Sequence, residues 1–225
     1  MNAPLRPSLP RGLYVLCDDT VRPGLPLGEK TARMLAGGAR VVQLRMKRTP
    51  LREALAAARE VVAACRRAGA VCLVNDRVDL ALLSGAHGVH VGDEDLPPEA
   101  ARELLGPEGL VGVTVRDAAG ARAAKAAGAD YVGLGPVFGT TTKQVAAPVL
   151  GLERFGAVVR ECPLPVVGIG GVKLENIAEL AAAGAHGGAV ASDVLLAEDL
   201  AERVRRLSAA FDRGARGTSL ASGDV

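Results

Sequence analysis

Aromatic residues are almost absent from this 225-residue sequence, which has two tyrosines, three phenylalanines and no tryptophan. Proteins that bind single-stranded nucleic acid stack bases on aromatic rings, so these few scattered rings argue against such a platform. Net charge is also small, because 27 Lys and Arg oppose 25 Asp and Glu to give +2. That balance excludes a surface that coats a polyanion and leaves room for a local basic pocket. We therefore expect small-molecule partners and no nucleic acid.

Long hydrophobic runs and paired cysteines are missing as well. No apolar stretch approaches the roughly 20 residues of a membrane-spanning helix, and the Pro-rich residues 1–11 lack the apolar core of a secretory signal. Cys17, Cys65, Cys72 and Cys162 form no Cys-x-x-Cys pair, so we expect reduced, buried thiols rather than a metal site or disulfides. These absences predict a cytoplasmic protein without a membrane partner. They leave open whether it is a homo-oligomer.

Small and aliphatic residues are abundant instead. Hydrophobic residues make up 49% of the sequence, which suffices for a core of Ala, Val, Leu and Ile. A helical pattern that ends in Gly-Ala and leads into a short β-branched run recurs along the chain. These Gly-Ala pairs begin at Gly38, Gly69, Gly85, Gly128 and Gly184. A glycine there suits the left-handed residue that ends a helix.

Strands that alternate with helices predict a parallel sheet. The expected strands start near residues 13, 41, 71, 88, 110, 131, 165 and 188. Eight such units predict an α/β fold, a single (β/α)8 TIM barrel with short loops. The rival is an open doubly wound sheet, which is weakened because no G-x-G-x-x-G follows the first strand. We expect the catalytic barrel at residues 12–213, between a flexible N-terminal segment (1–11) and a flexible C-terminal tail (214–225).

The second strand carries an unusual polar triad. In a barrel the active site forms at the C-terminal ends of the strands. Gln43, Arg45 and Lys47 alternate there and point to one face of an extended chain, while Leu44 and Met46 point to the other. Two cations and an amide at the mouth would clamp a polyanion. A solvated strand end is the alternative, but burying this triad without a ligand would be costly.

Acidic residues follow the next two strands. Asn75 and Asp76 end the third strand, and Asp95 follows the fourth. Carboxylates at adjacent strand ends can share a Mg²⁺ ion that also binds substrate phosphate. Both carboxylates could instead cap the following helices. The neighbouring cations favour the metal site.

The loops after the last three strands have sequences suited to binding anions. The sixth strand leads into a glycine-rich turn with hydroxyls and a lysine, namely Thr140, Thr141, Thr142 and Lys143. This turn is an anion-binding loop in form, and its lysine could also be a Schiff-base nucleophile. Glycines after the seventh and eighth strands, among them Gly171, would offer backbone N–H groups to a phosphate. The alternative is that they only make tight turns.

The three histidines are less informative. They form no Ser-His-Asp set and no metal-binding spacing. We expect His87 and His186 to be structural. His90 could reach the mouth, but we expect it to be packed.

Taken in order, these motifs resemble the thiamine-phosphate synthase family. The matching stretches are Gln-Leu-Arg-Met-Lys at 43–47, residues 75–81, residues 88–92 with Asp95, residues 133–138, Thr-Thr-Thr-Lys at 140–143, and residues 168–172. The resemblance covers about residues 12–208. Each piece is weak by itself, whereas the ordered set is specific.

The resemblance implies a transferase that condenses 4-amino-2-methyl-5-hydroxymethylpyrimidine diphosphate with 4-methyl-5-(2-phosphoethyl)thiazole or its carboxylated form. The products are thiamine phosphate and pyrophosphate, and Mg²⁺ is the cofactor. The pyrimidine diphosphate would be bound by Gln43, Leu44, Arg45, Met46, Lys47, Asn75 and Lys143. The thiazole phosphate would be bound by Thr140, Thr141, Thr142, Gly171, Ala191 and Ser192. Asp76 and Asp95 match the magnesium ligands, and Arg45, Lys47 and Lys143 would neutralise the departing pyrophosphate.

Some positions depart from the family pattern. Thr114, assigned to the substrate site, stands where the family usually has Ser, and the family's usual His shortly after it is absent. Asp93 stands where Gln is common, which adds negative charge near the metal. Ala191 replaces a usual Val, and Asp193 follows the phosphate-binding Ser192. We expect these changes to affect affinity and rate rather than the type of reaction.

Three alternatives stay open from the sequence. A thiazole-phosphate tautomerase of the same fold would make no C–N bond and would need no diphosphate clamp. A class I aldolase would use Lys143 to form an imine with its substrate. A non-catalytic barrel that senses a phosphorylated ligand would keep the phosphate loops without needing the two carboxylates.

Overall fold

Eight parallel strands close into one barrel. The computed structural model describes residues 8–139 and 148–221, with side chains through residue 217. Each strand is hydrogen-bonded to the next along the chain, and β8 closes the ring against β1. The strands are β1 (Gly12–Asp18), β2 (Val41–Arg45), β3 (Val71–Asn75), β4 (Gly88–Val91), β5 (Leu110–Val115), β6 (Tyr131–Leu134), β7 (Val166–Gly168) and β8 (Gly187–Val190). The predicted (β/α)8 barrel is confirmed, and each strand begins within one residue of its expected start.

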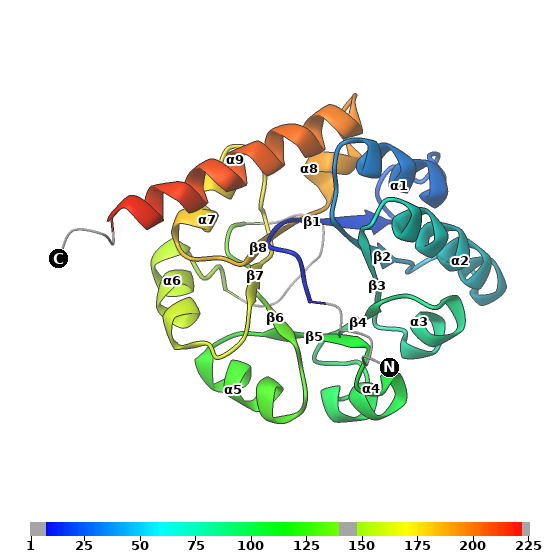
Figure 1. The fold of residues 1–225 in the computed structure, drawn as a ribbon, viewed down its shortest axis with the longest axis horizontal. Coiled ribbons are helices and arrows are strands. Elements are labelled where there is room, and N and C mark those ends of the chain that lie inside the picture. The colour runs from blue at the N-terminus through cyan, green and yellow to red at the C-terminus, as the bar shows by residue number, and fades with distance from the viewer. Residues whose placement is uncertain (1–7, 140–147, 222–225) are drawn as a thin grey trace, which may run out of the picture.

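Helices surround the ring of strands (Figure 1). They are α1 (Leu27–Ala36), α2 (Leu51–Arg67), α3 (Val78–Ser84), α4 (Pro98–Leu105), α5 (Ala118–Ala126), α6 (Leu152–Glu161), α7 (Ile177–Ala182), α8 (Ser192–Leu195) and α9 (Leu200–Ala221). Helix α2 shows why they pack there. It buries an apolar stripe that includes Ala58, Val62 and Cys65 and turns its charged residues outward.

The core has two layers because side chains alternate along each strand. One set packs between the sheet and the helices and includes Val15, Leu44 and Val132. The other set fills the inside of the barrel and includes both tyrosines of the chain, Tyr14 and Tyr131. The inside of the barrel is therefore a packed core and not a pore.

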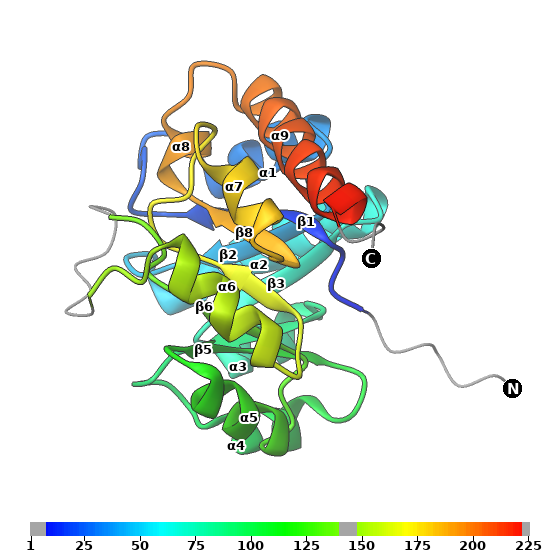
Figure 2. The ribbon, with the colours of Figure 1, turned by 90° about the vertical axis from the view of Figure 1, so that its left-hand side faces the viewer.

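Both expected flexible ends contain packed structure. Leu9 lies in the segment expected to be flexible, yet it is buried against the barrel interior, and its carbonyl lies 2.9 Å from His186 Nε2. At the other end α9 continues past residue 213 to Ala221. It crosses α7 (Figures 1 and 2), and a Cβ on Gly214 would lie 2.0 Å from the Ala178 carbonyl oxygen. Gly214 therefore permits a close helix crossing.

The sequence predicts reduced, buried cysteines and no membrane-spanning helix. All four cysteines are free thiols, and Cys17, Cys65 and Cys72 are buried, as the sequence predicted. Burial raises the pKa of the Cys17 thiol to about 11, which makes it a poor nucleophile at neutral pH. Within residues 8–139 and 148–221, no helix combines the length and apolar character needed to cross a membrane.

Candidate active site

The C-terminal ends of the strands surround a cavity of about 560 Å³. These ends lie on the left in Figure 2, opposite the N-terminus. The predicted residues on the cavity wall are Gln43, Arg45, Asn75, Thr114, Gly171, Ala191 and Ser192. They come from strands on different sides of the ring, so the closure of the barrel brings together residues that are distant in sequence.

Arg45 is held at the mouth by a buried carboxylate. Its Nη1 lies 2.6 Å from Oδ2 of Asp18, and the Asp18 side chain is almost fully buried. The other oxygen of Asp18 accepts hydrogen bonds from the backbone N–H and the hydroxyl of Thr20. A guanidinium has five N–H donors. Asp18 therefore orients Arg45 through one nitrogen and leaves the remaining donors for a ligand. Sequence reasoning missed Asp18. This residue ends the first strand, and the rule that barrel sites form at the C-terminal ends of strands would have identified it.

The loop after β2 is fixed by Asp19. Its carboxylate accepts hydrogen bonds from the backbone N–H groups of Lys47, Arg48 and Thr49 at 3.0, 2.8 and 2.8 Å. Burial acts to raise the pKa of Asp19, but these hydrogen bonds outweigh it, and the pKa of the carboxyl is lowered. Asp19 thus holds the backbone from which Lys47 projects.

Two acidic side chains meet beside the cavity. Oδ2 of Asp76 lies 2.5 Å from Nζ of Lys47, and Oδ2 of Asp95 accepts a hydrogen bond from the Gly92 N–H at 2.8 Å. Burial, and after it the neighbouring Asp76 carboxylate, raises the pKa of Asp95. Neither carboxylate makes the capping bond considered above, because α3 and α4 begin without a side-chain cap. The pair is therefore suited to bind a cation.

Two carboxylates are too few to surround a metal ion with protein ligands alone, and they fit the needs of Mg²⁺. Among the residues that the structure describes, no group of three or more His, Cys, Asp or Glu could hold an ion. Mg²⁺ commonly uses one or two carboxylates and completes its shell with water and substrate phosphate oxygens. Asp76 and Asp95 meet that requirement. Asp76 has a φ of 64°, a left-handed conformation that Asp tolerates better than most residues.

The glycines after β7 allow two loops to pack together. Gly170 and Gly171 have φ values of 92° and 65°, and a Cβ on Gly171 would lie 2.3 Å from the Gly139 carbonyl oxygen. The Phe138 N–H also donates to the Gly170 carbonyl at 3.0 Å. The turn after β7 therefore lies against the start of the segment that leads to the threonines. Thr140, Thr141, Thr142 and Lys143 themselves lie outside the described residues.

Two acidic departures from the family pattern are paired with arginines. Oδ1 of Asp193 lies 3.3 Å from Nη1 of Arg203 on α9, and its other oxygen accepts a hydrogen bond from the Leu174 N–H. Oδ2 of Asp93 lies 3.2 Å from Nη2 of Arg116. Both arginines line the cavity, so each added negative charge has a nearby positive one. Sequence reasoning missed these pairs because their members are 10 and 23 residues apart and lie on different elements, so that no local pattern links them.

Two residues assigned to the substrate site turn their side chains away from the cavity. Leu44 is completely buried in the core between the sheet and the helices. Met46 packs against the same core. Alternation along β2 explains the position of Leu44, whereas Met46 lies just past the end of the strand and is partly buried.

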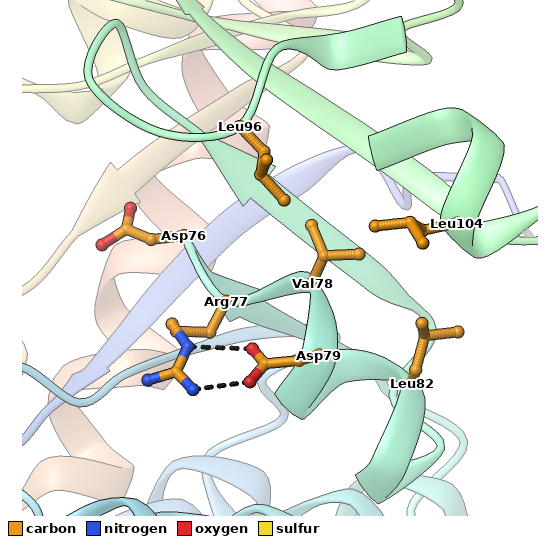
Figure 3. Close-up of a pocket in the computed structure, with 7 residues that line it drawn as sticks. All are labelled: Asp76, Arg77, Val78, Asp79, Leu82, Leu96 and Leu104. Carbon is orange, nitrogen blue, oxygen red and sulfur yellow. Dashed lines mark hydrogen bonds and ion pairs between the residues drawn. The ribbon is translucent and has the colours of Figure 1, made fainter. Parts of the chain in front are cut away.

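Beside the main cavity lies a smaller one of about 300 Å³. It is an apolar groove of leucines from α3, α4 and the loop before α4, with Asp76 at one end (Figure 3). The salt bridge between Arg77 and Asp79 lies along its edge (Figure 3). The Asp76 carboxylate lies on the side away from Leu82 and Leu104 (Figure 3).

His90 is more than a packed residue. It lines the cavity, and its Nε2 lies 3.1 Å from the hydroxyl of Thr114. His87 has a structural role, as expected, because its Nδ1 accepts a hydrogen bond from the Cys72 N–H.

Comparisons with known proteins agree with this geometry. The profile of a family described as thiamine monophosphate synthase matches residues 13–194. The chain belongs to this family. It is 75% identical to a thiamine-phosphate synthase of Myxococcus xanthus, over 95% of this chain and 98% of that protein. It is 47% identical to a thiamine-phosphate synthase of Anaeromyxobacter dehalogenans, over 92% of each chain.

A solved structure of the family has the same fold. The thiamine phosphate pyrophosphorylase from Pyrococcus furiosus is 36% identical and superposes with a TM-score of 0.83, over 90% of this chain and 96% of that chain. The family resemblance seen in the motifs is therefore confirmed over the barrel.

Proposed function

We propose that the barrel mouth joins the pyrimidine diphosphate to the thiazole phosphate to give thiamine phosphate and pyrophosphate. The observation that carries the proposal is the composition of one cavity. Arg45 and Gln43 lie on one part of its wall, and Gly171 and Ser192 lie on another. Family membership supports this transferase activity, and the substrates are small molecules.

The chemistry begins with the bond between the pyrimidine methylene carbon and the diphosphate oxygen. This C–O bond breaks and its electron pair leaves with pyrophosphate. The electron-rich aminopyrimidine ring stabilises the cation left on the methylene carbon. Arg45, Lys47 and Lys143 would stabilise the negative charge that develops on the leaving group. The lone pair of the thiazole nitrogen then forms the C–N bond.

Asp76 and Asp95 would hold Mg²⁺, which when bound supplies further positive charge to the departing pyrophosphate. Lys47, which pairs with Asp76, links this acidic pair to the cationic clamp. The thiazole nitrogen is already a nucleophile, so bond formation needs no general base. This accounts for the lack of a Ser-His-Asp pattern around the three histidines of the sequence.

Two kinds of residue separate this function from its alternatives. A tautomerase has no leaving diphosphate to neutralise, so Arg45 and Lys47 would lack a role. A ligand sensor would not need two adjacent carboxylates. We also propose a cytoplasmic location, which the free thiols support.

The test is a reaction of the purified chain with both phosphorylated substrates and Mg²⁺. We expect thiamine phosphate and pyrophosphate in equal amounts, and neither product when either substrate is omitted. Borohydride added together with a keto-acid phosphate, which could form an imine with a lysine, should leave the protein mass unchanged. A substrate-sized mass increase at Lys143 would instead favour the aldolase.

Ser192 offers a test of the two-part cavity. Ser192→Asp places a carboxylate at the end of β8 and should weaken binding of the thiazole phosphate at least tenfold through like-charge repulsion, while sparing the pyrimidine diphosphate. Calorimetric titration with each substrate measures this, and Ser192→Ala is the control without added charge. An equal loss of affinity for both substrates would contradict two separate subsites.

A further inference from the structure

A continuous chain of hydrogen bonds crosses the inside of the barrel. Nε2 of Gln43 donates to the Tyr14 hydroxyl at 2.8 Å, and the two tyrosine hydroxyls lie 2.8 Å apart. The Tyr131 hydroxyl lies 3.0 Å from Nδ1 of His90, whose Nε2 lies 3.1 Å from the Thr114 hydroxyl. Both ends of the chain, Gln43 and Thr114, line the active-site cavity.

Two glycines in the strands leave space for these hydrogen-bonded side chains. A Cβ on Gly112 would lie 2.1 Å from Cζ of Tyr131, and a Cβ on Gly133 would lie 3.0 Å from Cε1 of His90. Tyr14 and Tyr131 are nearly completely buried, and burial raises the pKa of both phenols far above neutrality. Each phenol therefore keeps its proton and has one hydrogen to donate.

The single hydrogen on each phenol gives the chain a direction. Gln43 donates to Tyr14, so the Tyr14 O–H donates onward to Tyr131, and the Tyr131 O–H donates to Nδ1 of His90. A neutral imidazole that accepts at Nδ1 carries its proton on Nε2, which then donates to the Thr114 oxygen. A doubly protonated ring would leave one buried phenolic hydrogen without an acceptor, which is costly.

We propose that Tyr14, Tyr131 and His90 are positioning residues that form a directional relay. The relay fixes His90 as the Nε2–H tautomer. It also orients the side chains at its two ends. The Thr114 hydroxyl, which accepts from His90, is left to donate into the cavity, and the Gln43 carbonyl oxygen is left to accept there.

This polarity selects a ligand by its hydrogen-bonding groups. A molecule that spans the two ends must offer an N–H group to Gln43 and an acceptor atom to Thr114. An aminopyrimidine with an attached diphosphate has both. This last step rests on the proposed function, whereas the direction of the relay does not.

The tautomer can be measured without any substrate. The chain has three histidines, so their side-chain ¹⁵N signals can be assigned by single substitutions. We expect His90 in the free protein to be protonated at Nε2 and not at Nδ1. Tyr131→Phe should change the His90 signals and leave those of His87 unchanged. An Nδ1–H tautomer of His90 in the unsubstituted protein would overturn the relay.

Kinetics test whether the relay positions the substrate contacts. Tyr14→Phe and Tyr131→Phe keep the rings and should each lower kcat/KM for the pyrimidine diphosphate about tenfold, as expected for one lost hydrogen bond. The KM for the thiazole phosphate should not change. Thr31→Val is the matched control, because the Thr31 hydroxyl is buried but bonds to Cys17 outside the relay.

The outcomes separate the relay from the reaction. If both phenylalanine variants keep normal kinetic constants while only their melting temperatures fall, as for Thr31→Val, the relay has no positioning role. If the unsubstituted protein makes no thiamine phosphate, the proposed function fails, and the His90 tautomer still decides the relay.

Discussion

Replacing Arg45 with alanine is expected to lower kcat by roughly 10²–10³-fold, the usual effect of losing one donor that stabilises transition-state charge. The substitution also leaves Asp18 buried without its partner, which lies 2.6 Å away in the native protein. An unpaired buried charge costs about 3–5 kcal/mol of folding stability. Steady-state kinetics and thermal unfolding measure the two effects separately.

A double variant distinguishes catalysis from stability. Asp18→Asn combined with Arg45→Ala removes the orphaned charge and should restore much of the melting temperature, while kcat stays low. Arg45→Lys keeps the charge but loses the planar fork, so its kcat should fall between those of the native protein and the alanine variant. Recovery of normal kcat in the double variant would show that Arg45 serves only to compensate Asp18.

Removing the charge of either proposed magnesium ligand is expected to have the second large effect. Asp76→Asn and Asp95→Asn should each lower turnover roughly 10²-fold and raise the Mg²⁺ concentration needed for half-maximal rate. Asparagine is chosen at position 76 because it tolerates the left-handed φ of 64° found there. Measuring the rate across a Mg²⁺ titration tests both variants.

Asp79 provides the matched control for this pair. It lies three residues from Asp76 and forms a salt bridge with Arg77 that is about half exposed, so Asp79→Asn should be nearly neutral. Normal activity and an unchanged Mg²⁺ titration in both ligand variants would contradict the metal assignment. A loss in Asp79→Asn as large as in the ligand variants would show that the effect is not specific to the site.

The fold could be predicted because its signals are local. Short β-branched runs, helical stripes and Gly-Ala helix ends recur along the chain, and each depends on neighbouring residues only. The rule that barrel sites lie at strand ends predicted Gln43, Arg45 and Asn75, which line one cavity, whereas Thr114 came from the family resemblance. Leu44 and Met46 were assigned to the site only because they belong to a stretch that matches the family. Alternation along the chain predicts instead that their side chains face the helices.

What the sequence could not predict depends on how separate elements pack against one another. Arg203 reaches the mouth from α9, and Tyr14 meets Tyr131 only when the barrel closes. The small and polar residues around Gly214 predict the start of a tail. The reason for Gly214 is a close approach to α7, a tertiary contact that local composition does not report.

The most direct test follows the oxygen that joins the methylene carbon to the diphosphate. The pyrimidine diphosphate is labelled with ¹⁸O at this position and incubated with the purified chain, the thiazole phosphate and Mg²⁺. Mass spectrometry then locates the label in the products. Transfer with C–O cleavage predicts that all the label leaves in pyrophosphate, in an amount equal to the thiamine phosphate formed. Label retained in free hydroxymethylpyrimidine, without thiamine phosphate, would mean hydrolysis at phosphorus and would contradict the proposed reaction.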